Sequence, residues 1–174
     1  MTRDETPGTA LPSSGPTGTC EFALTPLQLG MVYESTLAGR PWVNLEQVVV
    51  HLDDEDINSG ALRQAWATVA ARHEALRLSI LWRKRVTPMQ IVRDRAEVAL
   101  TVEDWSLMSP RKQAVSLAQY LEADRERGVD LEASPSWRVM LIRLGPKRSV
   151  MVWTVHHAMV DGRSIALVLQ QVFD

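Results

Sequence analysis

The chain has 174 residues, of which 45% are hydrophobic and 23% are charged, and its formal net charge is −2 at pH 7. This balance is typical of a globular protein with a real core, and the absence of a basic face argues against nucleic-acid or acidic-membrane partners. A single cysteine excludes an intrachain disulfide, and no apolar run is long enough to span a bilayer. We therefore expect a cytoplasmic protein.

The first twenty residues differ from the rest of the chain, because they are rich in Pro, Gly, Ser and Thr and contain almost nothing to bury. We expect residues 1–21 to form a disordered leader or linker, with structure beginning near Leu24. Residues 22–174 are then expected to fold as one lobe.

The segment Thr25-Pro26-Leu27-Gln28 predicts the start of a helix that ends near Gly39. Thr25 can cap this helix, Pro26 suits the first helical position, and Gln28 completes a capping box.

The following segments alternate between strand and helix patterns. Residues 45–52 are rich in β-branched residues and predict a strand. A helix follows, with a core-facing stripe at helical spacing made of Leu62, Ala65, Trp66, Val69, Ala70 and His73. Short strands are predicted next, at residues 76–82, 89–93 and 98–104.

A third helix is predicted from Ser109-Pro110 to Gly128, because proline suits a helix start and glycine a helix end. Its core-facing residues should be Ala114, Leu117, Ala118 and Leu121, and the charged run Glu122 to Arg127 should be a solvated face. Two strands at residues 137–144 and 149–156 and a last helix at 163–173 complete the pattern.

Helices and strands are intermixed, so the expected fold class is α/β, an α+β sandwich in which a mixed sheet is flanked by helices. The last helix is more apolar than a terminal helix on a solvated face should be. Either the chain folds this helix inside, or the helix packs against something that this sequence does not contain, and we favour a missing partner lobe.

The clearest chemical feature is a pair of histidines after a buried strand. Residues 150–155 (VMVWTV) are almost all apolar, which is typical of burial on both faces, and His156 and His157 follow directly. A histidine in the loop between a buried strand and a helix has a fixed backbone, while its ring stays accessible to a substrate. A general base requires both, because its nitrogen must lie within hydrogen-bonding distance of the proton that it removes. Because histidine titrates near neutral pH, the proton-accepting imidazole is available.

Other interpretations of this pair are possible. With Asp161 it could bind a metal ion, but adjacent strand residues point to opposite faces, and no Cys or His cluster supplies further ligands. Both histidines could also be ordinary core or turn residues. The pattern His-His-x-x-x-Asp-Gly after an apolar strand is more specific than a lone histidine, so we expect a functional site here and no metal site.

The segment His156-His157-Ala158-Met159-Val160-Asp161-Gly162 resembles the motif of the superfamily that includes chloramphenicol acetyltransferase and the condensation domains of nonribosomal peptide synthetases. Three further segments resemble the condensation branch in the right order: Leu24 to Met31, Arg72 to Arg77, and Val129 to Val139. Val129 and Leu78-Ser79-Ile80 depart from the usual residues, which affects packing more than chemistry.

The resemblance implies the N-terminal lobe of a condensation domain, with the C-terminal lobe absent from this sequence. In the family the two lobes form a V, and substrates meet in a tunnel between them. The implied reaction forms an amide bond between an acyl or peptidyl donor and an aminoacyl acceptor during the biosynthesis of antibiotics and other secondary metabolites. The implied partners are donor and acceptor peptidyl carrier proteins, together with adjacent synthetase domains. Because the carrier proteins supply the phosphopantetheine arms, the resemblance implies no metal or cofactor bound directly by this chain.

The resemblance also implies a role for each motif residue. His157 is the catalytic residue, which either removes the proton of the acceptor amine or orients that amine. His156 should be structural, with its ring bonded inside the lobe. Asp161 should form a buried ion pair with Arg77, although it could instead cap the last helix at an exposed position. Gly162 should permit the tight turn into that helix.

Three other functions share these residues. Epimerisation domains and dual epimerisation-condensation domains carry the same histidine motif, and Asn44-Leu45-Glu46-Gln47 is similar to the dual type. A coenzyme A-dependent acyltransferase would use the histidine with different acceptors. A single lobe could also act only as a non-catalytic module that docks carrier proteins.

Overall fold

The computed structural model describes residues 21–36, 39–53 and 56–174. The expected leader lies outside the described residues except for Glu21, which begins the first strand. The described residues form two sheets and four α-helices, which confirms the mixed α/β class.

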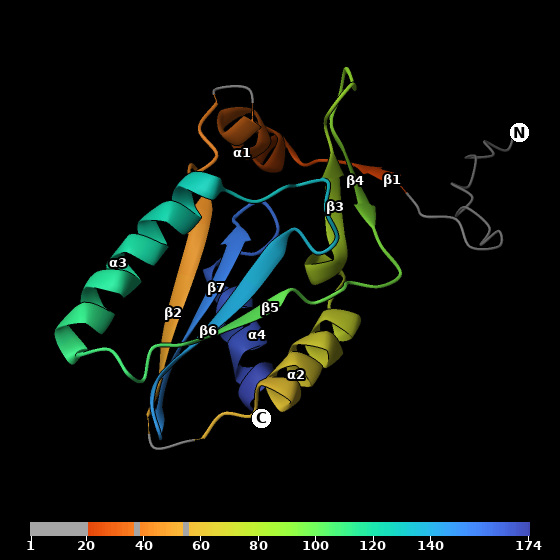
Figure 1. Ribbon diagram of the computed structural model, residues 1–174. Helices are drawn as coiled ribbons and strands as arrows, with labels where there is room; N and C mark the ends of the chain where they lie inside the picture. The colour runs from red at the N-terminus through yellow and green to blue at the C-terminus, as the bar shows by residue number, and fades with distance from the viewer. Residues whose placement is uncertain (1–20, 37–38, 54–55) are drawn as a thin grey trace, which may run out of the picture.

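The larger sheet has four strands in the order β2-β7-β6-β5: β2 (Leu45–Asp53), β7 (Arg148–His156), β6 (Trp137–Gly145) and β5 (Leu100–Asp104). Its only parallel pair is β5 with β6, so the sheet is mixed, as expected. Helix α3 (Pro110–Arg127) covers one face, and α2 (Ser59–Arg72) and α4 (Gly162–Phe173) cover the other (Figure 1). The core is therefore divided into two layers by the sheet.

A smaller sheet lies beside the first and has the strand order β1-β4-β3: β1 (Glu21–Ala23), β4 (Met89–Val92) and β3 (Leu78–Leu81). The strand predicted at residues 76–82 is shorter than expected, because residues 74–77 form a turn of 3₁₀-helix, η1 (Glu74–Arg77). Helix α1 (Pro26–Thr36) begins with the predicted capping box, in which the backbone N–H of Thr25 donates to Oε1 of Gln28 over 3.0 Å.

Strand β7 is central to the sheet and positions the histidine pair. It pairs with β2 on one side and β6 on the other, and every residue in it except Arg148 is buried. This confirms the expectation of burial on both faces. Leu45 at the start of β2 is opposite His156 at the end of β7, so the histidines emerge beside the loop that enters β2.

The core on the α2 and α4 side contains three tryptophans in mutual contact. The ring centroid of Trp66 lies 4.9 Å from that of Trp153 and 5.2 Å from that of Trp137. Nε1 of Trp137 donates to the carbonyl oxygen of Leu76 over 2.8 Å, which connects β6 to η1. Trp66 lies on the predicted apolar stripe of α2, and its burial confirms that stripe.

Helix α3 has the predicted bounds but only part of the predicted buried face: Leu117 and Leu121 pack against the core as expected. Ser109 caps its first turn and Gly128 follows its last residue, as expected. Ala114 and Ala118, which were expected in the core, are exposed, whereas Gln113 and Asp124 are buried. The prediction of a fully solvated run from Glu122 to Arg127 was therefore wrong at Asp124.

Asp124 is buried because the sheet supplies donors for both of its carboxylate oxygens. Nε of Arg138 on β6 donates to Oδ1 over 2.7 Å, and on the other oxygen Thr154 of β7 and Gln47 of β2 donate to Oδ2 over 2.6 and 2.8 Å. Burial alone would raise the pKa of Asp124, but these hydrogen bonds outweigh it and lower the pKa to about 2. A single carboxylate thus joins α3 to three adjacent strands.

Candidate active site at the end of strand β7

His157 is half-buried in the turn after β7, and both its backbone and its ring are held. Its backbone N–H donates to the carbonyl oxygen of Asn44 over 2.7 Å. Its ring Nδ1 lies 2.9 Å from the carbonyl oxygen of Val160. Because a carbonyl oxygen only accepts, Nδ1 carries the proton and Nε2 keeps its lone pair. The geometry therefore selects the tautomer that can accept a proton at Nε2.

Two residues outside the histidine motif fix the turn around His157. Nε2 of Gln28 donates to the carbonyl oxygen of Ala158 over 3.0 Å, so the residue that completes the helix cap also holds the turn that contains His157. Asn44 adopts a left-handed backbone conformation with φ of 59°, which asparagine tolerates better than most residues, and Nδ2 of Asn44 donates to Glu34 over 3.1 Å. The sequence predicted only that Gln28 caps α1. It did not predict that Gln28 and Asn44 would hold the turn around His157.

His156 is buried in a fully hydrogen-bonded position. Its Nε2 lies 2.6 Å from Oγ of Ser35, and its Nδ1 accepts from the backbone N–H of Ala158 over 3.1 Å. Burial, with a smaller contribution from His157, lowers the pKa of His156 to about 4. The ring is bonded inside the lobe and neutral at neutral pH, in the manner expected for a structural residue.

The low pKa of His156 makes the fold sensitive to mild acid. Unfolded histidine binds a proton below about pH 6.5, but folded His156 binds one only near pH 4, so unfolding free energy should fall as pH decreases through this window. Replacing His156 by Gln should destabilise the protein at pH 7 and reduce this slope, which is at most about 1.4 kcal/mol per pH unit. Urea denaturation of both proteins from pH 7 to 4.5 measures it. Equal slopes would show that another group is responsible.

The expected ion pair between Asp161 and Arg77 does not form. Asp161 is exposed and caps α4, with its Oδ1 accepting from the backbone N–H of Ser164 over 2.7 Å. Arg77 instead donates to backbone carbonyl oxygens, with Nε bonded to Arg93 over 2.9 Å and Nη1 to Ala70 over 3.0 Å. The prediction was wrong because a local cap satisfies the aspartate, while carbonyl oxygens at the end of α2 and just after β4 satisfy the arginine.

Gly162 follows as the first residue of α4, where the described atoms leave open space around a side chain built on its backbone. The chain turns into the helix here, but the backbone of Gly162 lies outside the left-handed region that favours glycine, so neither backbone conformation nor space requires glycine at this position. The structure thus brings His156, His157 and Asp161 to one end of the sheet, while Arg77 lies at the junction of η1 and β3.

The capping role predicts a mild effect for Asp161→Ala. A lost N-cap removes one hydrogen bond from the first turn of α4, so we expect the melting temperature to fall by a few degrees, without misfolding. Asp161→Asn should melt near the wild type, because asparagine caps as well as aspartate. Thermal unfolding followed by circular dichroism measures both variants. Aggregation of the Asn variant would indicate that the carboxylate has a partner essential to the fold.

Within the described part of the chain, no three His, Cys, Asp or Glu side chains are grouped closely enough to hold a metal ion. None of the described helices is long and apolar enough to cross a membrane.

The amino-acid sequence of this chain is similar to those of known proteins. The model of the condensation domain family matches residues 19–174. One subunit of the linear gramicidin synthase of Brevibacillus parabrevis is 38% identical over 151 residues, which are 86% of this chain and 3% of that protein. Bacitracin synthase 1 of Bacillus licheniformis is 26% identical over 152 residues, which are 87% of this chain and 3% of that protein.

Solved structures show the same fold. The starter condensation domain of rhizomide synthetase superimposes with a TM-score of 0.76 at 20% identity, covering 88% of this chain and 38% of that one. A cyclization-docking bidomain from Sorangium cellulosum gives a TM-score of 0.74 at 22% identity, covering 88% of this chain and 30% of that one. The chain thus spans only a small part of the length of the curated relatives, and little more than a third of the solved starter domain. Because the family model matches residues 19–174, which are most of the sequence, the chain belongs to the condensation domain family.

Proposed function

We propose that His157 is the catalytic residue of amide-bond formation between two carrier-bound substrates in nonribosomal peptide synthesis. The observation that carries this proposal is the fixed tautomer: Val160 holds the Nδ1 proton and leaves Nε2 as an acceptor. Family membership supports the class of reaction. A cytoplasmic location belongs to the same proposal.

In the proposed step the amine nitrogen of the acceptor attacks the thioester carbonyl carbon of the donor. Nε2 of His157 takes a proton from the amine as the C–N bond forms. The C–S bond then breaks, and the imidazolium returns the proton to the departing phosphopantetheine thiolate. The substrates and the arms enter on donor and acceptor carrier proteins, so the chain itself needs no bound cofactor.

We further propose that residues 22–174 are the N-terminal lobe of a larger domain, that residues 1–21 are a leader or linker, and that a C-terminal lobe covers α4. On this helix Val168 and Val172 are buried, but Leu167 and Phe173 are 48% and 44% exposed. Exposed apolar side chains on this helix favour an additional packing partner. This chain covers only 38% of the rhizomide starter domain, so most of that domain has no counterpart here and could include a second lobe.

Intact mass spectrometry tests the proposed reaction. An acceptor carrier loaded with an amino acid is mixed with an acyl-loaded donor carrier and with the 174-residue chain. A second arm uses this chain fused to the sequence that follows the matched segment in the gramicidin synthase relative that is 38% identical. The acceptor should gain the mass of the donor acyl group in at least one arm.

The outcomes separate the alternatives. Transfer from free acyl-coenzyme A but not from the donor carrier would indicate a coenzyme A-dependent acyltransferase. Inversion of the donor α-carbon without transfer would indicate an epimerisation domain. Carrier binding without any reaction by folded protein in both arms would overturn the catalytic proposal and leave a docking module.

A further inference from the structure

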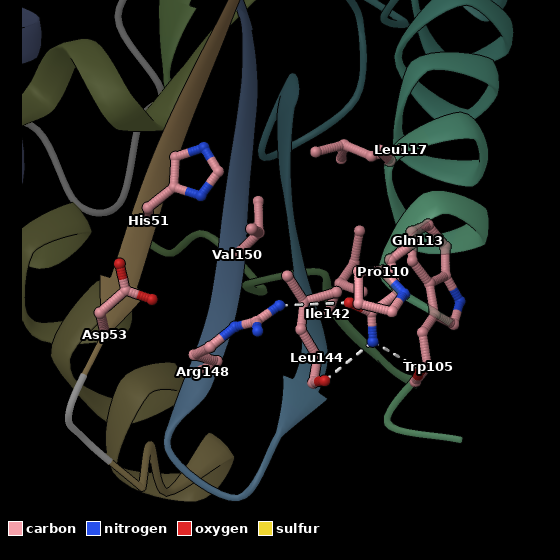
Figure 2. Close-up of a pocket in the computed structure, with 11 residues that line it drawn as sticks. His51, Asp53, Trp105, Pro110, Gln113, Leu117, Ile142, Leu144, Arg148 and Val150 are labelled. Carbon is pink, nitrogen blue, oxygen red and sulfur yellow. Dashed lines mark hydrogen bonds between the residues drawn. The ribbon is translucent and has the colours of Figure 1, made fainter. Parts of the chain in front are cut away.

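A groove of about 330 Å³ lies between the first half of α3 and strands β2, β6 and β7 (Figure 2). Helix α3 crosses the sheet from β6, where Gln113 bonds to Leu144, to β2, where Gln47 bonds to the carbonyl oxygen of Leu121. The last residues of β2, which include His51 and Asp53, are therefore left exposed beside the helix. This groove, called here the α3 groove, is separate from His157, which is at the other end of β7.

The interior of the α3 groove is apolar. Val150 and Ile142 form its floor and are fully buried, and Leu117 of α3 and Leu144 of β6 also line it. Trp105 adds an aromatic side chain near the start of α3 (Figure 2). A volume just above 300 Å³ with an apolar lining is at the small end of the range for sites that bind small molecules.

One wall of the groove holds a fixed cation. Gln113 is only 5% exposed, and its Nε2 donates to the carbonyl oxygens of Trp105 and Leu144 over 3.0 and 2.8 Å. Both amide hydrogens are therefore used, and Oε1 accepts from Nη2 of Arg148 over 3.2 Å. Since a guanidinium has five N–H groups, Arg148 keeps donors for an anion at the mouth of the groove.

The mouth also carries an anion. Asp53 is the cross-strand partner of Arg148 in the β2–β7 ladder, and both side chains line the groove. The described ion pairs do not include one between these two residues. An apolar space with one cation and one anion at its entrance is complementary to a small molecule that carries both charges and an apolar group.

We infer that the α3 groove binds a free apolar α-amino acid, such as leucine. Its carboxylate would pair with Arg148, its ammonium group with Asp53, and its side chain would cover Val150 and Ile142. This site does not depend on the proposed role of His157, so each can fail without the other.

Saturation-transfer NMR and calorimetric titration of the full 174-residue chain with L-leucine test the inference. Two probes each lack one charge: 4-methylpentanoate has no ammonium group, and isopentylamine has no carboxylate. Leucine should bind saturably, and each probe should bind about tenfold more weakly or worse, because one charge-assisted contact is lost.

Variants locate the binding. Arg148→Gln should weaken leucine binding about tenfold or more, and Asp53→Asn should weaken it as well. Ala114→Phe places a large side chain at an exposed helical position on the groove wall and should abolish binding while leaving the fold intact. Arg111→Gln, on the same helix but outside the groove, is the control and should bind like the wild type.

Three results would each overturn the inference. The first is no saturable leucine binding to folded protein. The second is leucine binding that Ala114→Phe leaves unchanged, since the ligand would then bind elsewhere. The third is equal affinity for leucine and for both single-charge probes, which would show that the charges at the mouth do not select the ligand.

Discussion

Replacing Asp124 by Ala should lower the free energy of unfolding by about 3–5 kcal/mol, the usual effect of removing one partner of a buried ion pair. The side chain of Asp124 is fully buried, and Arg138, Thr154 and Gln47 all donate to it. Its removal leaves the guanidinium of Arg138 largely buried without its carboxylate. Urea denaturation at pH 7 measures the change.

Asp124→Asn should be almost as destabilising as Asp124→Ala, although it changes only one atom. Both carboxylate oxygens accept hydrogen bonds from donors, so an amide NH₂ group placed at either oxygen would face another donor. Glu126→Ala is the matched control, because Glu126 is an exposed carboxylate on the same helix, and it should change stability by no more than about 0.5 kcal/mol.

The pH dependence supplies a second readout for Asp124. Its folded pKa of about 2 lies below its ordinary value of 3.8, so its contribution to stability is complete above about pH 4 and is lost as pH falls toward 2. The difference between wild type and Asp124→Ala should therefore shrink across this window. A difference that is the same at pH 5 and pH 2.5 would contradict the assigned hydrogen bonds.

The elements that the sequence predicted well are those marked by local chemistry. The capping box at Thr25 and Gln28, the Ser109 cap of α3 and the apolar run of β7 each need only neighbouring residues. The place of His157 at the end of a buried strand followed from that run. The cap at Asp161 is also local, but the resemblance to the family favoured an ion pair with Arg77 instead.

The features that the sequence did not predict depend on partners far away in the chain. Nothing within the charged run of α3 distinguishes Asp124 from Glu126, because the distinction comes from Arg138 and from Thr154, which is 30 residues away. The bond from Gln28 to Ala158 likewise joins residues 130 positions apart. Such pairings are set by the order of strands in the sheet, which periodicity alone does not determine.

Replacing His157 by Ala should lower the rate of carrier-to-carrier transfer by about 10²–10⁴, the usual contribution of a general base. The fold should remain intact, because His157 is only half-buried and its ring has one described hydrogen bond, to Val160. His157→Asn is the matched control for that bond, since its Nδ2 can replace Nδ1 as the donor to Val160 while Nε2 is removed. Single-turnover transfer measured by intact mass spectrometry gives the rates.

His157→Gln distinguishes a base from a group that only orients the amine. The glutamine amide reaches the position of Nε2, and its oxygen can accept a hydrogen bond from the amine but is not basic enough to take its proton. If His157 is the base, the Gln variant should be as slow as the Ala and Asn variants. A Gln variant that retains more than about a tenth of the wild-type rate would instead assign His157 to orientation, since general-base help is worth at least about 10². Ala and Gln variants that both react at the wild-type rate would remove His157 from the mechanism.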